Sequence, residues 1–395
     1  MKTFSEMNIS AALHQRLTAA QFVTPTPVQT QAIPPALEGK DIVATAQTGT
    51  GKTLAFLIPA IEMLEKTDSR NINVLVLVPT RELAMQVHEQ FEALRQKKMP
   101  PAALVIGGVS EKQQIRALRS NARLVVATPG RLEDYLRRRL VDLRHVQMLV
   151  LDEADRMLDM GFLPAIRRIL AVLPQKRQTV CFSATLEQSV AGLVAQCVKN
   201  PVRVALGNIL KPAASVELQA IETTAMQKSN VLRDLLYNEK GKTLVFARTK
   251  RGTERLAKEL MRDGFSAAMI HGDRSQSQRN AALSGFEEGR FKVLVATDVA
   301  ARGIHVDDVA HVVNFDLPSI AEDFIHRVGR TGRAGATGKA STLVSGAEIG
   351  ELRRFERTLK LQIKRTSPPA SAGVTQARSS RSPRNLMALP GEVFV

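Results

Sequence analysis

The stretch DIVATAQTGTGKT, residues 41–53, decides the fold of the first half of the chain. It begins with an apolar run, 41–46, that has the composition of a buried strand, and it leads into a segment with helical periodicity. Its second part follows the phosphate-binding pattern G-x-x-x-x-G-K-S/T, in which backbone N–H groups and a helix N-terminus face phosphate oxygens. Gly51, Lys52 and Thr53 occupy the last three positions, and Ala46 replaces the first Gly. A glycine-rich turn without a ligand is the alternative, and the order strand, loop, helix favours the phosphate site.

Apolar runs and amphipathic segments alternate along both halves of the chain. The runs are rich in Val, Ile and Leu and lack polar alternation, which is typical of parallel strands covered on both faces. We therefore expect an α/β fold with two tandem doubly wound parallel-sheet domains, at 1–206 and 215–363, and a linker at 207–214. The predicted strands are 41–46, 73–79, 103–106, 122–127, 147–151 and 179–183, then 216–223, 242–247, 266–270, 291–296, 311–315 and 338–344. The predicted helices include 81–95 and 130–139, then 226–237, 251–263, 277–287, 320–327 and 347–359.

The last segment, 364–395, differs from the rest in composition. It carries five basic residues against one acidic residue, separated by Ser, Pro, Ala and Gly. Such a segment cannot bury enough apolar surface to offset its ordering entropy, so we expect a disordered basic tail. An inert tail and an auxiliary tether for a polyanionic partner are equally good interpretations.

Composition excludes several classes of protein. No apolar run approaches the roughly 20 residues that span a bilayer, and the N-terminus lacks the apolar region of a secretory signal. Two cysteines cannot form a disulfide framework or a four-ligand zinc site. Lys and Arg number 55 against 38 Asp and Glu, a net charge of +17 that favours a polyanionic partner. Charge alone places nucleic acid only modestly ahead of an anionic membrane surface, or of a basic protein that is merely soluble.

A second motif strengthens the phosphate-site interpretation. The apolar run 148–151 ends in Asp152-Glu153-Ala154-Asp155, and a carboxylate at the carboxyl end of a parallel strand faces the ligand crevice. Asp152 is placed to hold Mg²⁺ through water, together with the Thr53 hydroxyl, and Glu153 to orient and deprotonate an attacking water. An acidic helix start is the alternative. Combined with Lys52, the motif predicts a nucleoside triphosphatase.

These motifs resemble those of the DEAD-box ATP-dependent RNA helicases of superfamily 2, over residues 4 to about 360, and most of all the bacterial RhlE-like group. The resemblance implies two RecA-like domains, ATP and Mg²⁺ as cofactors, and RNA as substrate. Residues 22–29 resemble the Q motif, in which Gln29 reads the adenine edge and Phe4 packs on the base, although Gln21 replaces the usual Gly. The remaining nucleotide contacts fall on Gln47, Thr48, Gly49, Thr50, Gly51, Lys52 and Thr53.

The resemblance also assigns RNA contacts, coupling residues and arginine fingers. Ser183 and Thr185 belong to the motif that links the ATP state to RNA binding. His326, Arg330 and Arg333 belong to the last motif, in which the two arginines reach the γ-phosphate across the cleft. The RNA contacts fall on Thr80, Arg81, Gly108, Thr128, Pro129, Gly130 and Arg131 in the first domain and on Gly272, Gln276, Arg279 and Thr297 in the second.

One residue departs from the family pattern. His305 stands where the family has an Asp that contacts the nucleotide ribose. A carboxylate accepts two hydroxyl hydrogen bonds and a neutral imidazole accepts one. We therefore expect a weaker or altered ribose contact, or replacement by Asp307 or Asp308.

The sequence thus predicts an RNA helicase whose domains close when ATP and RNA are both bound, prying short duplexes apart with little sequence preference. We expect a cytoplasmic monomer without a membrane partner, and ribosome-assembly or RNA-degradation factors as protein partners. A DNA helicase of the same superfamily is a rival, opposed by Gln29 and the RNA-type motifs. An RNA clamp with incidental hydrolysis is another, opposed by the intact Lys52 and Glu153.

Overall fold

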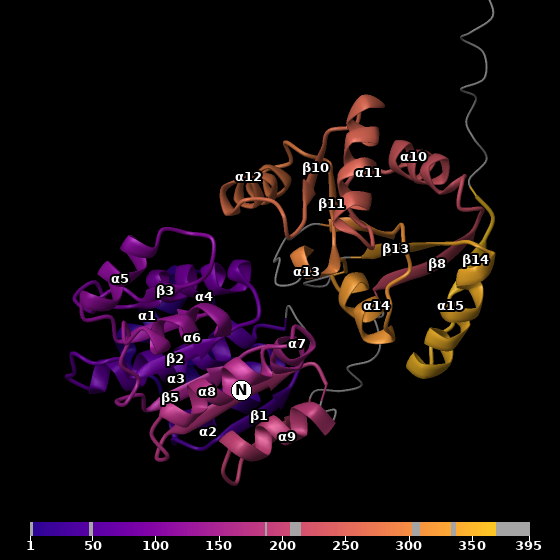
Figure 1. The fold of residues 1–395 in the computed structure, drawn as a ribbon. Helices are drawn as coiled ribbons and strands as arrows, with labels where there is room; N and C mark the ends of the chain where they lie inside the picture. The colour runs from indigo at the N-terminus through magenta and orange to yellow at the C-terminus, as the bar shows by residue number, and fades with distance from the viewer. Residues whose placement is uncertain are drawn as a thin grey trace, which may run out of the picture.

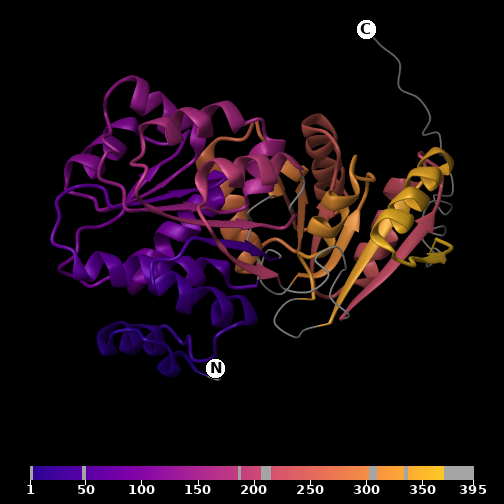
Figure 2. The same cartoon turned by 90° about the horizontal axis from the view of Figure 1, so that it is seen from below.

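The computed structural model describes residues 3–46, 50–185, 188–205, 215–301, 309–332 and 337–368 of the chain. These residues form two units that lie side by side (Figure 1). Each unit is built on one seven-stranded sheet. Figure 2, seen from below, shows the first unit and the second unit as separate layered bodies. The predicted pair of tandem parallel-sheet domains is confirmed.

The first sheet has the strand order β3-β4-β2-β5-β6-β1-β7, and its neighbouring strands pair in parallel. Its central position holds β5, so the residues that follow β5, β6 and β1 meet at one edge of the sheet. The strands are β1 Ile42–Thr45, β2 Val74–Leu77, β3 Ala103–Val105, β4 Leu124–Ala127, β5 Met148–Leu151, β6 Gln178–Ser183 and β7 Val202–Ala205. The helices are α1 Ala11–Ala19, α2 Pro27–Leu37, α3 Lys52–Lys66, α4 Arg81–Leu94, α5 Glu111–Arg119, α6 Pro129–Arg137, α7 Ala154–Asp159, α8 Leu163–Val172 and α9 Gln188–Cys197, after a 3₁₀ turn at Phe4–Glu6.

The second sheet repeats this topology, with the order β10-β11-β9-β12-β13-β8-β14 and parallel pairing. The repeat makes β8 the counterpart of β1 and β12 the counterpart of β5. The strands are β8 Val216–Glu222, β9 Lys242–Phe246, β10 Ala267–Ile270, β11 Val293–Ala296, β12 Val309–Asn314, β13 Gly338–Val344 and β14 Lys364–Thr366. The helices are α10 Lys228–Asn238, α11 Lys250–Arg262, α12 Gln276–Glu287, α13 Asp298–Ala301, α14 Ala321–Val328 and α15 Gly346–Leu359.

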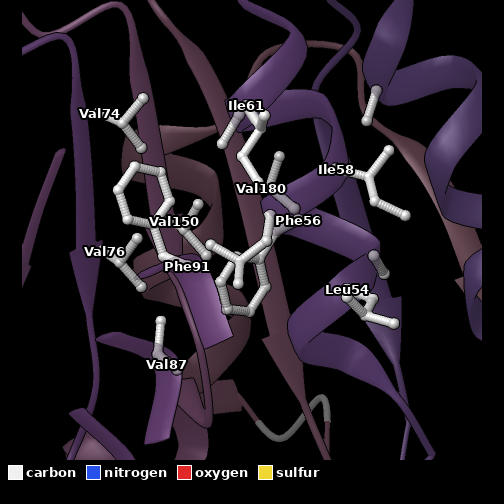
Figure 3. Close-up of a cluster of buried hydrophobic side chains, with 14 of the residues drawn as sticks. Leu54, Phe56, Ile58, Ile61, Val74, Val76, Val87, Phe91, Val150 and Val180 are labelled. Atoms are coloured by element: carbon white, nitrogen blue, oxygen red, sulfur yellow. The ribbon is translucent and has the colours of Figure 1, made fainter. Parts of the chain in front are cut away.

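Each sheet is buried on both faces, because alternate residues of one strand enter different apolar clusters. Val74 and Val76 of β2 pack with Phe56 and Phe91, whereas Leu75 and Leu77 enter the cluster on the other face. Figure 3 shows the first of these clusters, with side chains of α3 and α4 against the central strands. Burial of each such side chain contributes about 1.5–3 kcal/mol. The double coverage explains why the strands read as apolar runs without alternation.

The twelve predicted strands are confirmed, most of them one or two residues shorter than predicted, and two further strands were not predicted. β7 and β14 lie at sheet edges, where the strand needs less apolar surface. The predicted tail does not begin at Lys364, because Lys364–Thr366 pairs with β8 and belongs to the second sheet. The predicted linker 207–214 and residues 369–395 lie outside the described residues. In the part of the chain that is described, no helix has both the length and the apolar character needed to cross a membrane.

Candidate functional site

The first cavity lies at the carboxyl edge of the first sheet and has a volume of about 550 Å³. Gly51 caps α3 with φ of +87°, a left-handed conformation that favours glycine, and so turns the loop into the helix. The cavity brings together residues from three separate motifs of the sequence. Its lining includes Phe4, Phe22, Gln29, Gly51, Lys52, Thr53, Asp152 and Glu153.

Gln29 is fixed before any ligand binds. Its Oε1 accepts a hydrogen bond from the Thr26 backbone N–H (2.8 Å), and its Nε2 donates to the Gly51 carbonyl (2.9 Å). A Cβ at Gly51 would lie 2.4 Å from that Nε2, so the close approach requires glycine. One amide hydrogen of Gln29 remains for a ligand. The adenine-reading role predicted for Gln29 is thus compatible with its position in the cavity.

Lys52 and Asp152 face each other inside this cavity and are both buried. The Lys52 Nζ lies 3.7 Å from the Asp152 Oδ1, which is beyond hydrogen-bond distance. Burial raises the pKa of Asp152 to about 6, and the Lys52 charge opposes this rise only in part. A buried ammonium and a buried carboxylate that form an ion pair without a hydrogen bond leave room for further charged groups beside them. This is the electrostatic arrangement that phosphate and a divalent cation would complete.

Glu153 has an unusual backbone conformation. Its φ of +52° is left-handed, which costs a non-glycine residue on the order of 1–3 kcal/mol. The turn ends β5 and starts α7, and it directs the chain so that Asp152 and Glu153 both line the cavity. The Glu153 Oε2 also lies 3.6 Å from the Arg156 Nε.

The coupling residues predicted from the sequence are tied directly to the acidic motif. Asp155 Oδ2 accepts hydrogen bonds from the backbone N–H of Ala184 (3.0 Å) and of Thr185 (3.2 Å). The Ser183 hydroxyl donates to the Thr185 carbonyl at 2.6 Å. The end of β6 is therefore held against the start of α7. The contact is made by Asp155, two residues after the predicted base Glu153.

A second cavity of about 560 Å³ lies between the two units. Eight residues predicted to contact RNA line it, whereas Pro129, Gln276 and Thr297 do not. Pro129 is buried at the start of α6, and Thr297 is buried between β11 and α13. The eight are Thr80, Arg81, Gly108, Thr128, Gly130, Arg131, Gly272 and Arg279.

The glycines of this cavity allow close packing of an arginine. Gly108 has φ of +78°, and a Cβ there would lie 2.3 Å from the Arg81 Nη1. The Arg81 guanidinium therefore lies against bare backbone, with part of its hydrogen-bonding edge toward the cavity. Thr80, which precedes it, caps α4 by accepting a hydrogen bond from the Leu83 N–H.

Glu82, which the sequence analysis did not single out, connects the two units. Its Oε1 accepts a hydrogen bond from the Gln276 Nε2 (3.0 Å) and forms an ion pair with the Arg279 Nη2 (2.9 Å), both on α12. Burial lowers the pKa of Arg279, and Glu82 opposes that change. Glu82 lies in the first turn of α4, after the capping residue Thr80. An acidic residue is common at that position, so the sequence gives no sign of a contact with the second unit.

The helix that carries Glu82 reaches both cavities. Thr80, Arg81 and Glu82 line the cavity between the units. Leu83 and, one to two turns later, Gln86, Glu89 and Gln90 line the cavity of the first unit. A single rigid element, α4, therefore touches both candidate ligand sites.

The last motif lies at the seam between the units rather than in the first cavity. His326 and Arg330 line a small cavity there, and the Arg330 Nε donates to the His326 carbonyl at 3.2 Å. Arg327 lies between them and was not singled out; its Nη2 binds Asp298 Oδ2 at 2.7 Å, and its Nη1 donates to the Asp316 carbonyl at 2.6 Å. Arg333, Gln47, Thr48, Gly49 and His305 lie outside the described residues.

The chain matches two known protein families over most of its length. Residues 26–193 match the DEAD/DEAH box helicase family, and residues 227–335 match the helicase conserved C-terminal domain. The chain is 41% identical over 370 residues to the DEAD-box ATP-dependent RNA helicase CshA of Geobacillus kaustophilus, covering 93% of this chain and 79% of the relative. CshA of Bacillus subtilis is also 41% identical, over 368 residues. The chain belongs to the DEAD-box ATP-dependent RNA helicases.

It is accordingly an ATP-hydrolysing enzyme that acts on RNA, as the motifs predicted. The RhlE-like grouping stays a prediction, since the relatives named here are CshA proteins.

Solved structures resemble the chain in its domain arrangement as well as its fold. Dbp5 of S. cerevisiae bound to RNA and ADP BeF3 has a TM-score of 0.84 at 30% identity, covering 93% of this chain and 96% of that one. The helicase Mss116 bound to ssRNA and UDP-BeF has a TM-score of 0.87 at 27% identity, covering 94% and 81%. A DEAD box protein of Methanococcus jannaschii is 38% identical, covering 93% and 99%, yet its TM-score is only 0.55.

Proposed function

We propose that the two cavities divide the work of the helicase, with ATP bound in the cavity of the first unit and the RNA backbone in the cavity between the units. The observation that carries this proposal is the position of α4, which lines both cavities and holds the second unit through Glu82. ATP and RNA acting on one rigid element would each change the affinity for the other.

The residues of the first cavity fit the parts of a nucleoside triphosphate. Gln29 offers its remaining amide hydrogen to the base, and Phe4 and Phe22 supply apolar surface beside it. The N-terminus of α3 and the Lys52 ammonium face the phosphates. Glu153 is the residue proposed to orient the attacking water and to take its proton on a carboxylate oxygen.

The donor set also fits Mg²⁺. Among the described residues, no group of three or more His, Cys, Asp or Glu side chains could hold a metal ion by itself. Mg²⁺ commonly binds through one or two protein oxygens, with phosphates and water as the other ligands. Asp152 and the Thr53 hydroxyl are the groups proposed to hold it, and the raised pKa of Asp152 reflects a carboxylate for which a cation would compensate. When bound, the ion would neutralise charge on the phosphate oxygens.

Closure of the second unit is proposed to bring Arg330 and Arg333 toward the γ-phosphate. The higher TM-scores with RNA-bound and nucleotide-analogue-bound structures support an arrangement near that closed state. In the cavity between the units, Arg81, Arg131 and Arg279 are the charged groups available to phosphates. Glycines and helix starts provide the rest, so contacts fall on the backbone and read little sequence.

The remaining predictions belong to the same proposal. We infer a monomer that works in the cytoplasm, with ribosome-assembly or RNA-degradation factors as partners, and with the tail as either an inert segment or an RNA tether. His305 is proposed to weaken or alter the ribose contact.

The decisive experiment compares steady-state ATP hydrolysis with single-stranded RNA, with single-stranded DNA and without nucleic acid, beside a Glu153→Gln variant. We expect stimulation by RNA that DNA does not match and that the variant abolishes. Displacement of a short RNA strand under the same conditions separates unwinding from clamping. Equal stimulation by DNA, or a fully active Glu153→Gln variant, would contradict the assignment.

A further inference from the structure

Arg156 lies three residues after Glu153, the proposed base, and is buried in an unusual way. It is only 2% exposed and is among the largest fully buried side chains of the described residues. Its Nη1 and Nη2 find no hydrogen-bond partner in the part of the chain that the structure describes. Buried polar groups are nearly always paired, so each exception needs an explanation. The proposed mechanism does not use this residue.

The second unit supplies much of what covers Arg156. The small cavity beside it is otherwise lined entirely by residues of the second unit: Phe246, Asp298, Ala301, Asp323, His326, Arg327 and Arg330. Figure 1 shows α7, which carries Arg156, on the side of the first unit that faces α13 and α14. The cavity measures about 10 Å³, room for no more than about one water molecule. The guanidinium therefore cannot keep the hydration that it has in bulk water.

The charges around Arg156 come from both units. In its own unit, Glu153 Oε2 lies 3.6 Å from the Arg156 Nε. In the second unit, the carboxylates of Asp298 and Asp323 line the shared cavity, together with the cationic Arg327 and Arg330. Arg327 already holds both oxygens of Asp298. The seating of the second unit therefore also removes the ion pair of Arg156 with Glu153 from water.

We propose that Arg156 is a positioning residue that ties the seating of the second unit to the orientation of Glu153. Removal of water lowers the local dielectric, and the attraction between two charges at 3.6 Å grows severalfold as a result. With the units apart, water screens the pair and weakens the attraction of Arg156 for the Glu153 carboxylate. With the units together, Arg156 holds the Glu153 carboxylate in one place. This proposal rests on the role proposed above for Glu153.

The test compares Arg156→Met, which keeps the length and removes the charge, with Arg156→Lys, which keeps the charge. We expect Arg156→Met to lower RNA-stimulated kcat about tenfold or more, while the KM for ATP and the RNA affinity change less than about twofold. Arg156→Lys should recover a substantial part of kcat. Arg144→Met is the matched control, because Arg144 is exposed and pairs only with its neighbour Asp142; it should behave as wild type.

A double variant decides whether Arg156 acts through Glu153. In a Glu153→Gln background, Arg156→Met should cause little further loss in single-turnover hydrolysis, because the partner charge is already absent. An equal further loss would overturn the proposal, as would a rise in KM that accounts for the whole effect, or no effect of Arg156→Met. A Glu153→Gln variant that retains full activity would instead refute the proposed role of Glu153, so the two failures are distinguishable. Thermal melting of each variant excludes unfolding as the cause.

Discussion

The two units share one topology but use the same place in it differently. Lys52 is the first residue of α3, after β1, and Lys228 is the first residue of α10, after the equivalent strand β8. Both lysines are buried. The Lys228 Nζ binds Glu348 at 2.7 Å and the Phe315 carbonyl at 3.0 Å, whereas the Lys52 Nζ lies 3.7 Å from its carboxylate. Figure 2 shows the helix that carries Glu348, α15, on the side of the second unit away from the first.

The difference shows why the same position of the fold forms a candidate ligand site in one unit and a structural contact in the other. In the second unit the lysine is satisfied by the protein, and it stabilises the packing of α10 against α15. In the first unit the ammonium and Asp152 are held apart beside a cavity of about 550 Å³. Burial without full pairing costs stability, and a ligand that carries charge recovers that cost.

The largest expected effect comes from exchanging each lysine for methionine. Lys52→Met should lower ATP hydrolysis by at least about 10²-fold with little change in Tm, because it removes a phosphate contact but no strong protein contact. Lys228→Met should lower the free energy of unfolding by about 2 kcal/mol, because it removes the 2.7 Å ion pair and leaves the half-buried Glu348 to Ser345 and the more distant Arg248. Steady-state kinetics and thermal melting measure both. Equal loss of hydrolysis in the two variants, at a temperature where both are folded, would contradict the comparison.

The two units should respond to pH in opposite directions. In the second unit, burial lowers the pKa of His311 from 6.5 to about 4, so the unfolded state binds the proton more tightly. Stability is lost as the pH falls from about 6.5 to about 4, by about 3 kcal/mol. In the first unit, Asp152 has its pKa raised from 3.8 to about 6, so its contribution is present below pH 3.8 and is lost as the pH rises through about 6.

Hydrogen exchange of the nucleotide-free protein between pH 4 and 7 follows each unit separately. His311→Gln should flatten the profile of the second unit only, and Asp152→Asn that of the first unit only. A parallel response of both units to either substitution would show that they do not unfold independently.

The link between the units can be weakened at Glu82. Glu82→Gln keeps the shape of the side chain but removes the charge that pairs with Arg279 and that accepts the hydrogen bond from Gln276. We expect RNA affinity to fall about tenfold in the presence of a nonhydrolysable ATP analogue, since a hydrogen bond to a charged group contributes about 1.5–3 kcal/mol. Fluorescence titration without nucleotide should show a much smaller change. Glu133→Gln, which loses an ion pair with the exposed Arg168, is the control and should leave both affinities intact.

The smallest effect is expected from the C-terminal segment. Removal of 369–395 should leave maximal ATP hydrolysis nearly unchanged and raise the RNA concentration needed by a few fold, because three arginines of the segment no longer reach phosphates. Truncation after residue 363 also removes β14 and should lower the Tm of the second unit. Equal RNA affinity with and without 369–395 at low salt would favour the inert tail.

The buried strands could be predicted from the sequence because each one is a continuous run of apolar residues. Strands such as Val74–Leu77 and Val293–Ala296 have no polar residue and lie inside their sheets. β7 and β14 escaped prediction because edge strands include exposed and charged residues, such as Arg203 and Lys364.

The site divides in the same way. Lys52 and Asp152 follow strand ends in recognisable motifs, and the structure places them together in the first cavity. Glu82 and Arg156 carry no such signal, because a carboxylate in a first helical turn and an arginine on a short helix are both ordinary. The residues of the second unit that lie beside them are far away along the chain, and only the folded arrangement of the two units reveals them.

The position of α4 has a consequence for ligand design. Its fourteen residues extend about 21 Å, from Arg81 in the cavity between the units past Gln86 and Gln90 in the cavity of the first unit. A small molecule that fills the space beside Gln86 and Gln90 would press on the same helix that carries Arg81 and Glu82. Such a compound would compete with ATP for space. By linkage it would also change the affinity for RNA, although it would not contact RNA.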